Sequence, residues 1–113
     1  MANTFNNGKV QLTTTSITDV YQAPTGAGNV AVVLSALAAN YNGSASADIT
    51  LSLTDSSNNL LSYIGYTIPV PADTTLELIP NRVVLKAGEK LRATASSANY
   101  FYITVSTLEV TTP

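Results

Sequence analysis

The side chains that most often carry out acid–base chemistry or bind metal ions are sparse in this sequence. It contains no histidine and no cysteine, so the commonest general base and the thiolate metal ligands are both missing. A glycosidase needs two carboxylates that converge on one sugar, and the spacing of the carboxylates here does not indicate convergence. They are Asp19, Asp48, Asp55, Asp73, Glu77, Glu89 and Glu109. We therefore expect no enzyme activity, no catalytic residues, no cofactor and no metal centre.

Three short motifs resemble known ligand or modification sites. Residues 55–59 (DSSNN) offer the oxygen ligands that Ca²⁺ prefers, but they lack the fixed spacing and terminal Glu of an EF-hand. Residues 26–28 (GAG) lack the further glycine of a phosphate-binding loop. Residues 42–44 (NGS) match the N-glycosylation pattern, but no signal peptide is recognisable at the N-terminus. We interpret all three as turns or loops.

The tyrosines offer one plausible binding chemistry. A tyrosine presents a flat apolar face and a hydroxyl, which together suit a sugar ring. Tyr63, Tyr100 and Tyr102 lie on strand positions opposite, or nearly opposite, the predicted core positions, so they could form a stripe on the surface. The alternative is that they are ordinary cross-strand aromatic residues or anchors of a protein interface.

The composition narrows the class of protein. The chain of 113 residues has the length of one domain. Only 11% of its residues are charged, against roughly 25% in typical soluble domains. A net charge of −2 argues against nucleic-acid binding, and no apolar run reaches the roughly 18 residues of a membrane span. A weakly charged surface rich in Thr, Ser and Asn favours packing in an assembly.

Short alternating segments separated by turn residues predict the fold. Eight or nine strands recur at a spacing typical of an all-β protein, so we expect an antiparallel β-sandwich, jelly-roll-like, as a single domain over residues 9–113. Gly65 predicts a bulge or a close approach within its strand. The predicted strands cover residues 9–15, 17–21, 30–39, 47–54, 60–70, 75–79, 82–86, 90–96 and 100–110.

Residues 29–41 (NVAVVLSALAANY) are apolar on both alternating faces. The segment is a strand or a short buried helix; its three valines disfavour a helix, and Ser35 is the one polar residue inside it. As a strand, it has a second face of mostly small residues that suits contact with a partner. That face, which we expect to be the less buried one, comprises Ala31, Val33, Ser35, Leu37 and Ala39.

The two ends of the chain depart from simple alternation. Residues 1–8 are polar and rich in Asn, and we interpret them as an N-terminal arm, not a strand, with Phe5 available to dock on a neighbouring subunit. In the last strand the apolar positions change parity after Val105, with Leu108 and Val110 on the other face. This change predicts a β-bulge or a change of sheet near Ser106 and Thr107.

The order of several segments resembles that of a known group of proteins. These segments are residues 20–26 (VYQAPTG), the apolar strand ending in Ala39 and Asn40, residues 68–71 (IPVP), residues 83–91 (VVLKAGEKL) and residues 93–97 (ATASS). Over residues 13 to 110 the pattern resembles small structural proteins of tailed bacteriophages, including cyanophages. The resemblance implies an antiparallel β-sandwich present in many copies on a virion.

From this resemblance we expect a non-enzymatic virion protein, most simply a capsid decoration or cement protein that packs on capsid subunits and on itself. The alternative is a tail, neck or fibre-attachment protein with a glycan-binding role. We expect a homo-oligomer, with a trimer favoured, assembled in the cytoplasm of the bacterial host, and no nucleic acid or membrane partner. The candidate interface residues are Phe5, Val33, Leu37, Tyr63, Tyr100 and Tyr102.

Overall fold

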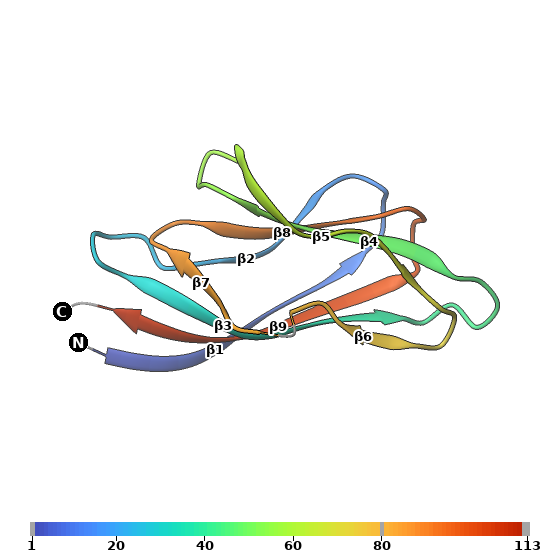
Figure 1. The fold of residues 1–113 in the computed structure, drawn as a ribbon, viewed down its shortest axis with the longest axis horizontal. Helices are drawn as coiled ribbons and strands as arrows, with labels where there is room; N and C mark the ends of the chain where they lie inside the picture. The colour runs from blue at the N-terminus through green and yellow to red at the C-terminus, as the bar shows by residue number, and fades with distance from the viewer. Residues whose placement is uncertain (1, 80, 112–113) are drawn as a thin grey trace.

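The protein folds as two packed antiparallel sheets (Figure 1). The computed structural model describes residues 2–79 and 81–111, and these residues contain no helix. The predicted all-β sandwich is therefore confirmed. The strands are β1 (Ala2–Leu12), β2 (Thr18–Gln22), β3 (Val30–Asn40), β4 (Ala47–Thr54), β5 (Leu60–Val70), β6 (Thr75–Glu77), β7 (Val83–Lys86), β8 (Lys90–Ala95) and β9 (Phe101–Thr111).

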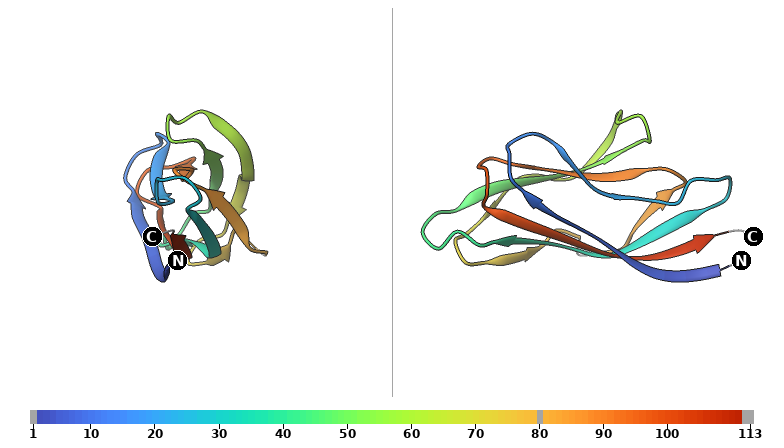
Figure 2. Two further views of the ribbon diagram at one scale, coloured as in Figure 1. Left: turned by 90° about the vertical axis from the view of Figure 1, so that its left-hand side faces the viewer. Right: turned by 180° about the vertical axis from the view of Figure 1, so that it is seen from behind.

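The strand order is that of a jelly roll. Sheet A has the order β1-β9-β3-β6, with β7 pairing the same edge of β3, and sheet B has the order β2-β8-β4-β5. The chain passes repeatedly from one sheet to the other, so neighbours within a sheet are mostly far apart in sequence. The end-on view in Figure 2 shows the two sheets enclosing the space between them, with the start of β1 beside the end of β9.

The core lies between the sheets and follows the alternation of the sequence. Leu91 and Ala93 of β8 face inward, as do Phe101 and Ile103 of β9 and Leu51 of β4, and all of them are fully buried. Full burial of one large apolar side chain stabilises the fold by about 1.5–3 kcal/mol. The intervening residues on these strands form the outer faces, where any binding site must lie.

The N-terminal segment is a strand, so our interpretation of residues 2–8 as an arm is wrong. β1 pairs with β9 along its whole length, from Ala2 opposite Thr111 to Leu12 opposite Phe101 (Figure 2). Backbone hydrogen bonds to β9 hold this polar segment in place, and they do not depend on apolar side chains. Met1 lies outside the described residues.

Residues 30–40 form a strand, so the alternative of a short helix is wrong. A β-bulge interrupts it: Val33 pairs with Thr107 and Ser35 pairs with Ser106, which leaves Leu34 as an extra residue on β3. The irregularity predicted near Ser106 and Thr107 is therefore present in this strand pair, but its extra residue belongs to β3. β9 itself keeps its alternation through Thr107, which is buried.

The bulge also changes which residues of β3 face the core. Val33 is 0% exposed, whereas Leu37, at the same parity in sequence, is 37% exposed. The expectation that both residues share one partly buried face is therefore wrong, because the extra residue between them inverts the alternation. Val33 belongs to the core and is unavailable to a partner.

Glu77 joins the strands at the point where β6 ends. Its Oε1 accepts hydrogen bonds from the backbone N–H of Ala36, at 2.9 Å, and from that of Ile79, at 3.1 Å. The N–H of Leu78 donates to the carbonyl of Ala36 at 2.7 Å. The carboxylate thus satisfies backbone donors where the regular ladder between β3 and β6 stops.

Candidate functional site

A row of four apolar side chains crosses the outer face of sheet A. Phe5 of β1 lies opposite Leu108 of β9. Leu108 in turn lies opposite Val32 of β3, and on the other side of β3 Val32 lies opposite Val84 of β7. Directly paired residues of an antiparallel sheet point to the same face, so these four side chains form one row, the apolar row. Phe5 is 76% exposed and Val84 is 56% exposed, while Leu108 and Val32 are half-buried.

The apolar surface extends beyond the apolar row on one side of it and ends at the row on the other side. Toward the end of the sheet that carries the termini, the next row has Val110 and Val30 at its centre, with Asn3 of β1 and Lys86 of β7 at its two ends. On the opposite side, the next row is polar and consists of Asn7, Ser106 and Ser35. The outer face of sheet A therefore presents an apolar area with a polar border, and such a surface is typical of a protein interaction site.

A second aromatic feature lies at the other end of the same face. The rings of Tyr41 and Tyr102 are 5.0 Å apart between centroids and tilted by 46°. The Tyr41 hydroxyl accepts a 2.8 Å hydrogen bond from Nε2 of Gln11, and both rings are partly exposed to solvent. This pair is separate from the apolar row, because Tyr102 pairs with Ala39 and Gln11 three rows away.

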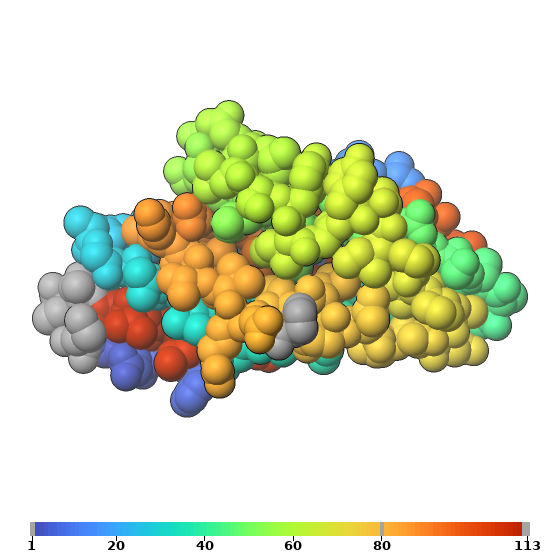
Figure 3. Space-filling view, viewed as in Figure 1, coloured from blue at the N-terminus to red at the C-terminus, as the bar shows by residue number. Residues whose placement is uncertain are grey.

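Sheet B carries a groove on its outer face. The register between β4 and β5 shifts at three places, two of them at Gly65 and its partner Leu51. This confirms the irregularity that Gly65 predicted. The hairpin of β4 and β5 rises above the rest of sheet B in Figures 1 and 3, in green to yellow-green. The register shifts turn β5 away from β4 and leave the groove along the outer side of β4 and β8.

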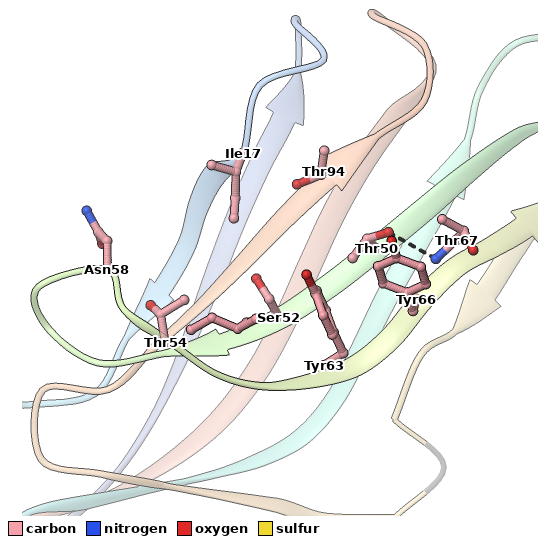
Figure 4. Close-up of a pocket in the computed structure, with 10 residues that line it drawn as sticks. Ile17, Thr50, Ser52, Thr54, Asn58, Tyr63, Tyr66, Thr67 and Thr94 are labelled. Atoms are coloured by element: carbon pink, nitrogen blue, oxygen red, sulfur yellow. Dashed lines mark hydrogen bonds between the residues drawn. The ribbon is translucent and has the colours of Figure 1, made fainter.

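The groove combines an aromatic wall with a floor of hydroxyl groups (Figure 4). It encloses about 330 Å³. Tyr63 and Tyr66 project into it from β5, with ring centroids 4.7 Å apart and the rings edge to face. The lining residues are Ile17, Thr50, Ser52, Thr54, Asn58, Leu60, Tyr63, Tyr66, Thr67 and Thr94. We call this the sheet B groove.

Thr67, in the wall of the sheet B groove, has an unusual backbone conformation. Its φ is +47°, which a β-branched residue rarely adopts because its Cβ crowds the backbone. The Thr67 N–H donates a 3.0 Å hydrogen bond to Oγ1 of Thr50 (Figure 4). This hydrogen bond ties the strained segment of β5 to the floor of the groove.

An ion-pair cluster lies beside the floor of the groove. Asp19 of β2 lies opposite Arg92 of β8 in the strand pairing, and Arg92 lies opposite Ser52 of β4, which belongs to the floor. Oδ1 of Asp19 is 2.6 Å from Nε of Arg92, and Oδ2 is 3.2 Å from Nζ of Lys90. Burial opposes ionisation of Asp19, but its bonds to Arg92 and Lys90 outweigh that effect and lower the pKa of the carboxyl below its usual value. The single carboxylate of this cluster faces two cations, so the cluster carries a net charge of +1.

The predicted tyrosine stripe does not form. Tyr63 lies on the outer face of sheet B, while Tyr102 lies on the outer face of sheet A, so the two rings face away from each other. Tyr100 precedes β9 and is half-buried against the core. Of the other predicted interface residues, Phe5 and Leu37 are exposed on sheet A and Val33 is in the core.

Sequence reasoning missed most residues of these two surfaces. The missed residues include Val32, Val84 and Leu108 of the apolar row, and Tyr66 and the hydroxyl-bearing floor of the sheet B groove. The members of the apolar row come from four strands, and each strand contributes one residue. The change of parity at Leu108 was the one signal in the sequence that an apolar residue faces outward there.

In the loop of residues 55–59, the carboxylate oxygens of Asp55 accept hydrogen bonds from other residues of the same loop. Oδ1 of Asp55 accepts the N–H groups of Ser57 and Asn59, each at 2.9 Å, and Oδ2 accepts Nδ2 of Asn59 at 3.0 Å. The hydrogen bonds from Asn59 lower the pKa of Asp55. Within residues 2–79 and 81–111, no three Asp, Glu, His or Cys side chains are placed to share a metal ion.

Residues 42–44 form a loop that is closed by the side chain of Asn42. Oδ1 of Asn42 accepts the backbone N–H groups of Ser44 and Ala45, each at 2.9 Å, so residues 42–44 form the turn that we predicted. No helix in the described part of the chain has the length and apolarity that crossing a membrane would require.

No protein-family model matches the chain, and a search of curated proteins gives no match.

Proposed function

We propose that this protein is a non-enzymatic structural protein of a tailed-bacteriophage virion and that it works by burying the apolar row of sheet A against a second copy of itself. The observation that carries the proposal is the register of Phe5, Leu108, Val32 and Val84 across four strands. A row of this kind exposes apolar surface that water solvates poorly, and burying it releases about 25 cal/mol per Å².

The surroundings of the apolar row favour a second copy as the occupant. The bordering row is made of the uncharged residues Asn7, Ser106 and Ser35, so two copies can approach without desolvating charges there. The chain carries a net charge of only −2, which keeps repulsion between copies weak. A stable interface buries about 800 Å² on each partner, which the face of sheet A can supply if neighbouring rows join the contact.

On the particle, we propose that the oligomer is a capsid decoration or cement protein, with a trimer favoured. Closed symmetry repeats one patch on every subunit, and repetition over a virion strengthens individually weak contacts. A component of the tail, neck or fibre attachment is the alternative position. The jelly roll occurs in viral capsid and lectin domains alike, so it supports the class of protein by analogy and leaves the position to experiment.

Removing the gene from the virus that encodes this chain tests the proposed role. We expect heads that lack the protein to lose DNA under osmotic shock or heating more readily than wild-type heads. Adding back the purified protein should restore resistance, and adding back the Phe5→Glu variant should not. Heads that are equally resistant without the protein would contradict the cement role, and defective tails on such particles would favour the alternative position.

A further inference from the structure

The sheet B groove has the chemistry of a ligand site that the proposed assembly function does not use. It lies on the sheet opposite the apolar row, so both surfaces can be occupied at the same time. We propose that the groove binds an uncharged carbohydrate, with a sugar ring against Tyr63 and Tyr66 and its hydroxyl groups on the floor of β4 and β8. This proposal does not depend on the assembly function.

The aromatic wall suits the apolar face of a sugar. Tyr63 is 50% exposed and Tyr66 is 63% exposed, so neither ring is used up by packing in the core. Their edge-to-face contact at 4.7 Å holds the two rings at an angle to each other. Neither hydroxyl has a hydrogen-bond partner among the residues that the structure describes. Each can therefore donate to or accept from a ligand.

The floor offers both donors and acceptors. Oγ1 of Thr50 accepts the N–H of Thr67, which leaves the Thr50 hydroxyl proton free to donate. Ser52 is only 2% exposed and its Oγ donates to the carbonyl of Arg92 at 3.2 Å, so the half-buried Thr50 and Thr94 carry the hydroxyls that a ligand can reach. The hydroxyl of Thr94 has no partner within the described residues. A sugar hydroxyl both donates and accepts, so this mixed floor complements it.

The lining of the groove is uncharged, which favours an uncharged ligand. The residues that line it within the described chain carry neither a carboxylate nor a cationic group. Arg92 and Lys90 lie beside the groove, where they share the carboxylate of Asp19, and Nζ of Lys90 also donates to Oδ1 of the lining residue Asn58 at 3.0 Å. An anionic ligand, such as a phosphate or a sialylated sugar, would find no cationic side chain in the described lining itself to offset the loss of its hydration. A neutral sugar carries no charge that would have to be desolvated on binding.

The size and shape of the groove are also suitable. Its volume of about 330 Å³ lies at the lower end of the range for small-ligand sites, which suits one or two sugar rings. Thr67, whose φ is positive, directly follows Tyr66 in the chain. Strain of this kind persists only where the surrounding structure enforces it, and it occurs often at ligand sites.

A glycan array carrying both neutral and sialylated oligosaccharides tests the proposal, followed by saturation-transfer NMR with the best neutral glycan. We expect binding to neutral glycans, weakened at least tenfold by Tyr66→Ala or Tyr63→Ala. Tyr102→Ala is the matched control, because Tyr102 is 49% exposed but lies on sheet A. Thr94→Val, which removes one free hydroxyl with little change in shape, should also weaken binding and keeps the test valid if a tyrosine variant folds poorly.

Three results would overturn the proposal. The first is the absence of binding to any neutral glycan in the array and in NMR at millimolar ligand. The second is binding that Tyr102→Ala abolishes while Tyr63→Ala and Tyr66→Ala leave it unchanged. The third is a preference for sialylated over neutral glycans. None of these outcomes bears on self-association through the apolar row, so failure here is distinguishable from failure of the proposed function.

Discussion

The hydroxyl of Tyr21 on β2 donates a 2.5 Å hydrogen bond to Oε2 of Glu109 on β9, and this bond links sheet B to sheet A. The same Oε2 accepts a 3.0 Å hydrogen bond from Nδ2 of Asn6 on β1. Glu109 lies between Leu108 and Val110, whose side chains point to the other face of sheet A. The inward bonds of Glu109 therefore hold in place the part of β9 that presents the apolar row.

Tyr21→Phe removes this link while keeping the ring. We expect the free energy of unfolding to fall by about 1–2 kcal/mol at pH 7, because the lost hydrogen bond ends on a carboxylate. Urea unfolding followed by circular dichroism measures the change. The exposed ring of Tyr66 provides the control, since Tyr66→Phe removes a hydroxyl that makes no bond among the described residues. Equal stability of the Tyr21 variant and the wild type would contradict the structural role of this bond.

The same bond predicts a dependence on alkaline pH. Burial and the hydrogen bond to Glu109 raise the pKa of Tyr21 to about 12 in the folded protein, against about 10 in the unfolded chain. Its contribution to stability is fully present below pH 10 and is lost as the pH rises from about 10 to about 12. The difference in stability between wild type and Tyr21→Phe should shrink over that interval. A difference that stays constant to pH 12 would contradict the raised pKa.

Gly8 permits the close approach of the sheets at the edge formed by β1 and β2. A Cβ at this position would lie 2.5 Å from the carbonyl oxygen of Val20 and 2.9 Å from Cβ of Tyr21. Gly8→Ala should therefore destabilise the fold by about 1–3 kcal/mol, as overpacking of a tight contact does. The matched control is Gly43→Ala, whose added Cβ would lie 3.8 Å from its nearest neighbour, in Asp73. Thermal unfolding should separate the two variants, and equal midpoints would refute the steric argument.

Glu77 is exposed, but its carboxylate accepts two backbone hydrogen bonds and so contributes to the stability of the fold. Glu77→Ala leaves the N–H groups of Ala36 and Ile79 without their acceptor, and we expect a loss of about 1–2 kcal/mol. Glu77→Gln should recover part of this stability, because the amide oxygen still accepts. Asp48→Ala serves as the comparison, since it removes a carboxylate that accepts no hydrogen bond within the described chain. Chemical unfolding that ranks Glu77→Ala level with Asp48→Ala would contradict this role.

The sequence predicts the positions of the strands better than it predicts which side chains of a strand face the core. The strands at residues 47–54 and 60–70 have the predicted bounds, because regular alternation and turn residues mark them clearly. The bulge at Leu34 could not be predicted, since a segment that is apolar on both faces carries no information about a change of parity. This is why Val33 and Leu37 were placed together although the fold separates them.

The two candidate surfaces depend on pairings that the sequence does not encode locally. Phe5 and Leu108 are neighbours only because β1 and β9 pair from opposite ends of the chain, and β1 looked like an arm because its side chains are polar. The sheet B groove depends on the register shifts between β4 and β5. Gly65 marked the irregular segment, but the direction in which β5 turns follows from packing.

We expect burial of the apolar row against a second copy to make the purified protein self-associate, and sedimentation equilibrium measures this association. The variants are wild type, the double variant Phe5→Glu/Val84→Glu, and the control Thr104→Glu, which adds a charge on the outer face of β9 four residues from Leu108. Phe5, Val84 and Thr104 are exposed in the isolated chain, so none of these changes should disturb the core.

We predict that the wild type self-associates, with a trimer favoured, and that the double variant weakens association at least tenfold at an unchanged thermal midpoint. The control should associate within about threefold of the wild type, because it lies beyond the polar border of the apolar row. A wild type that remains monomeric at every concentration, or a double variant that assembles as strongly as the wild type, would contradict self-association through the apolar row.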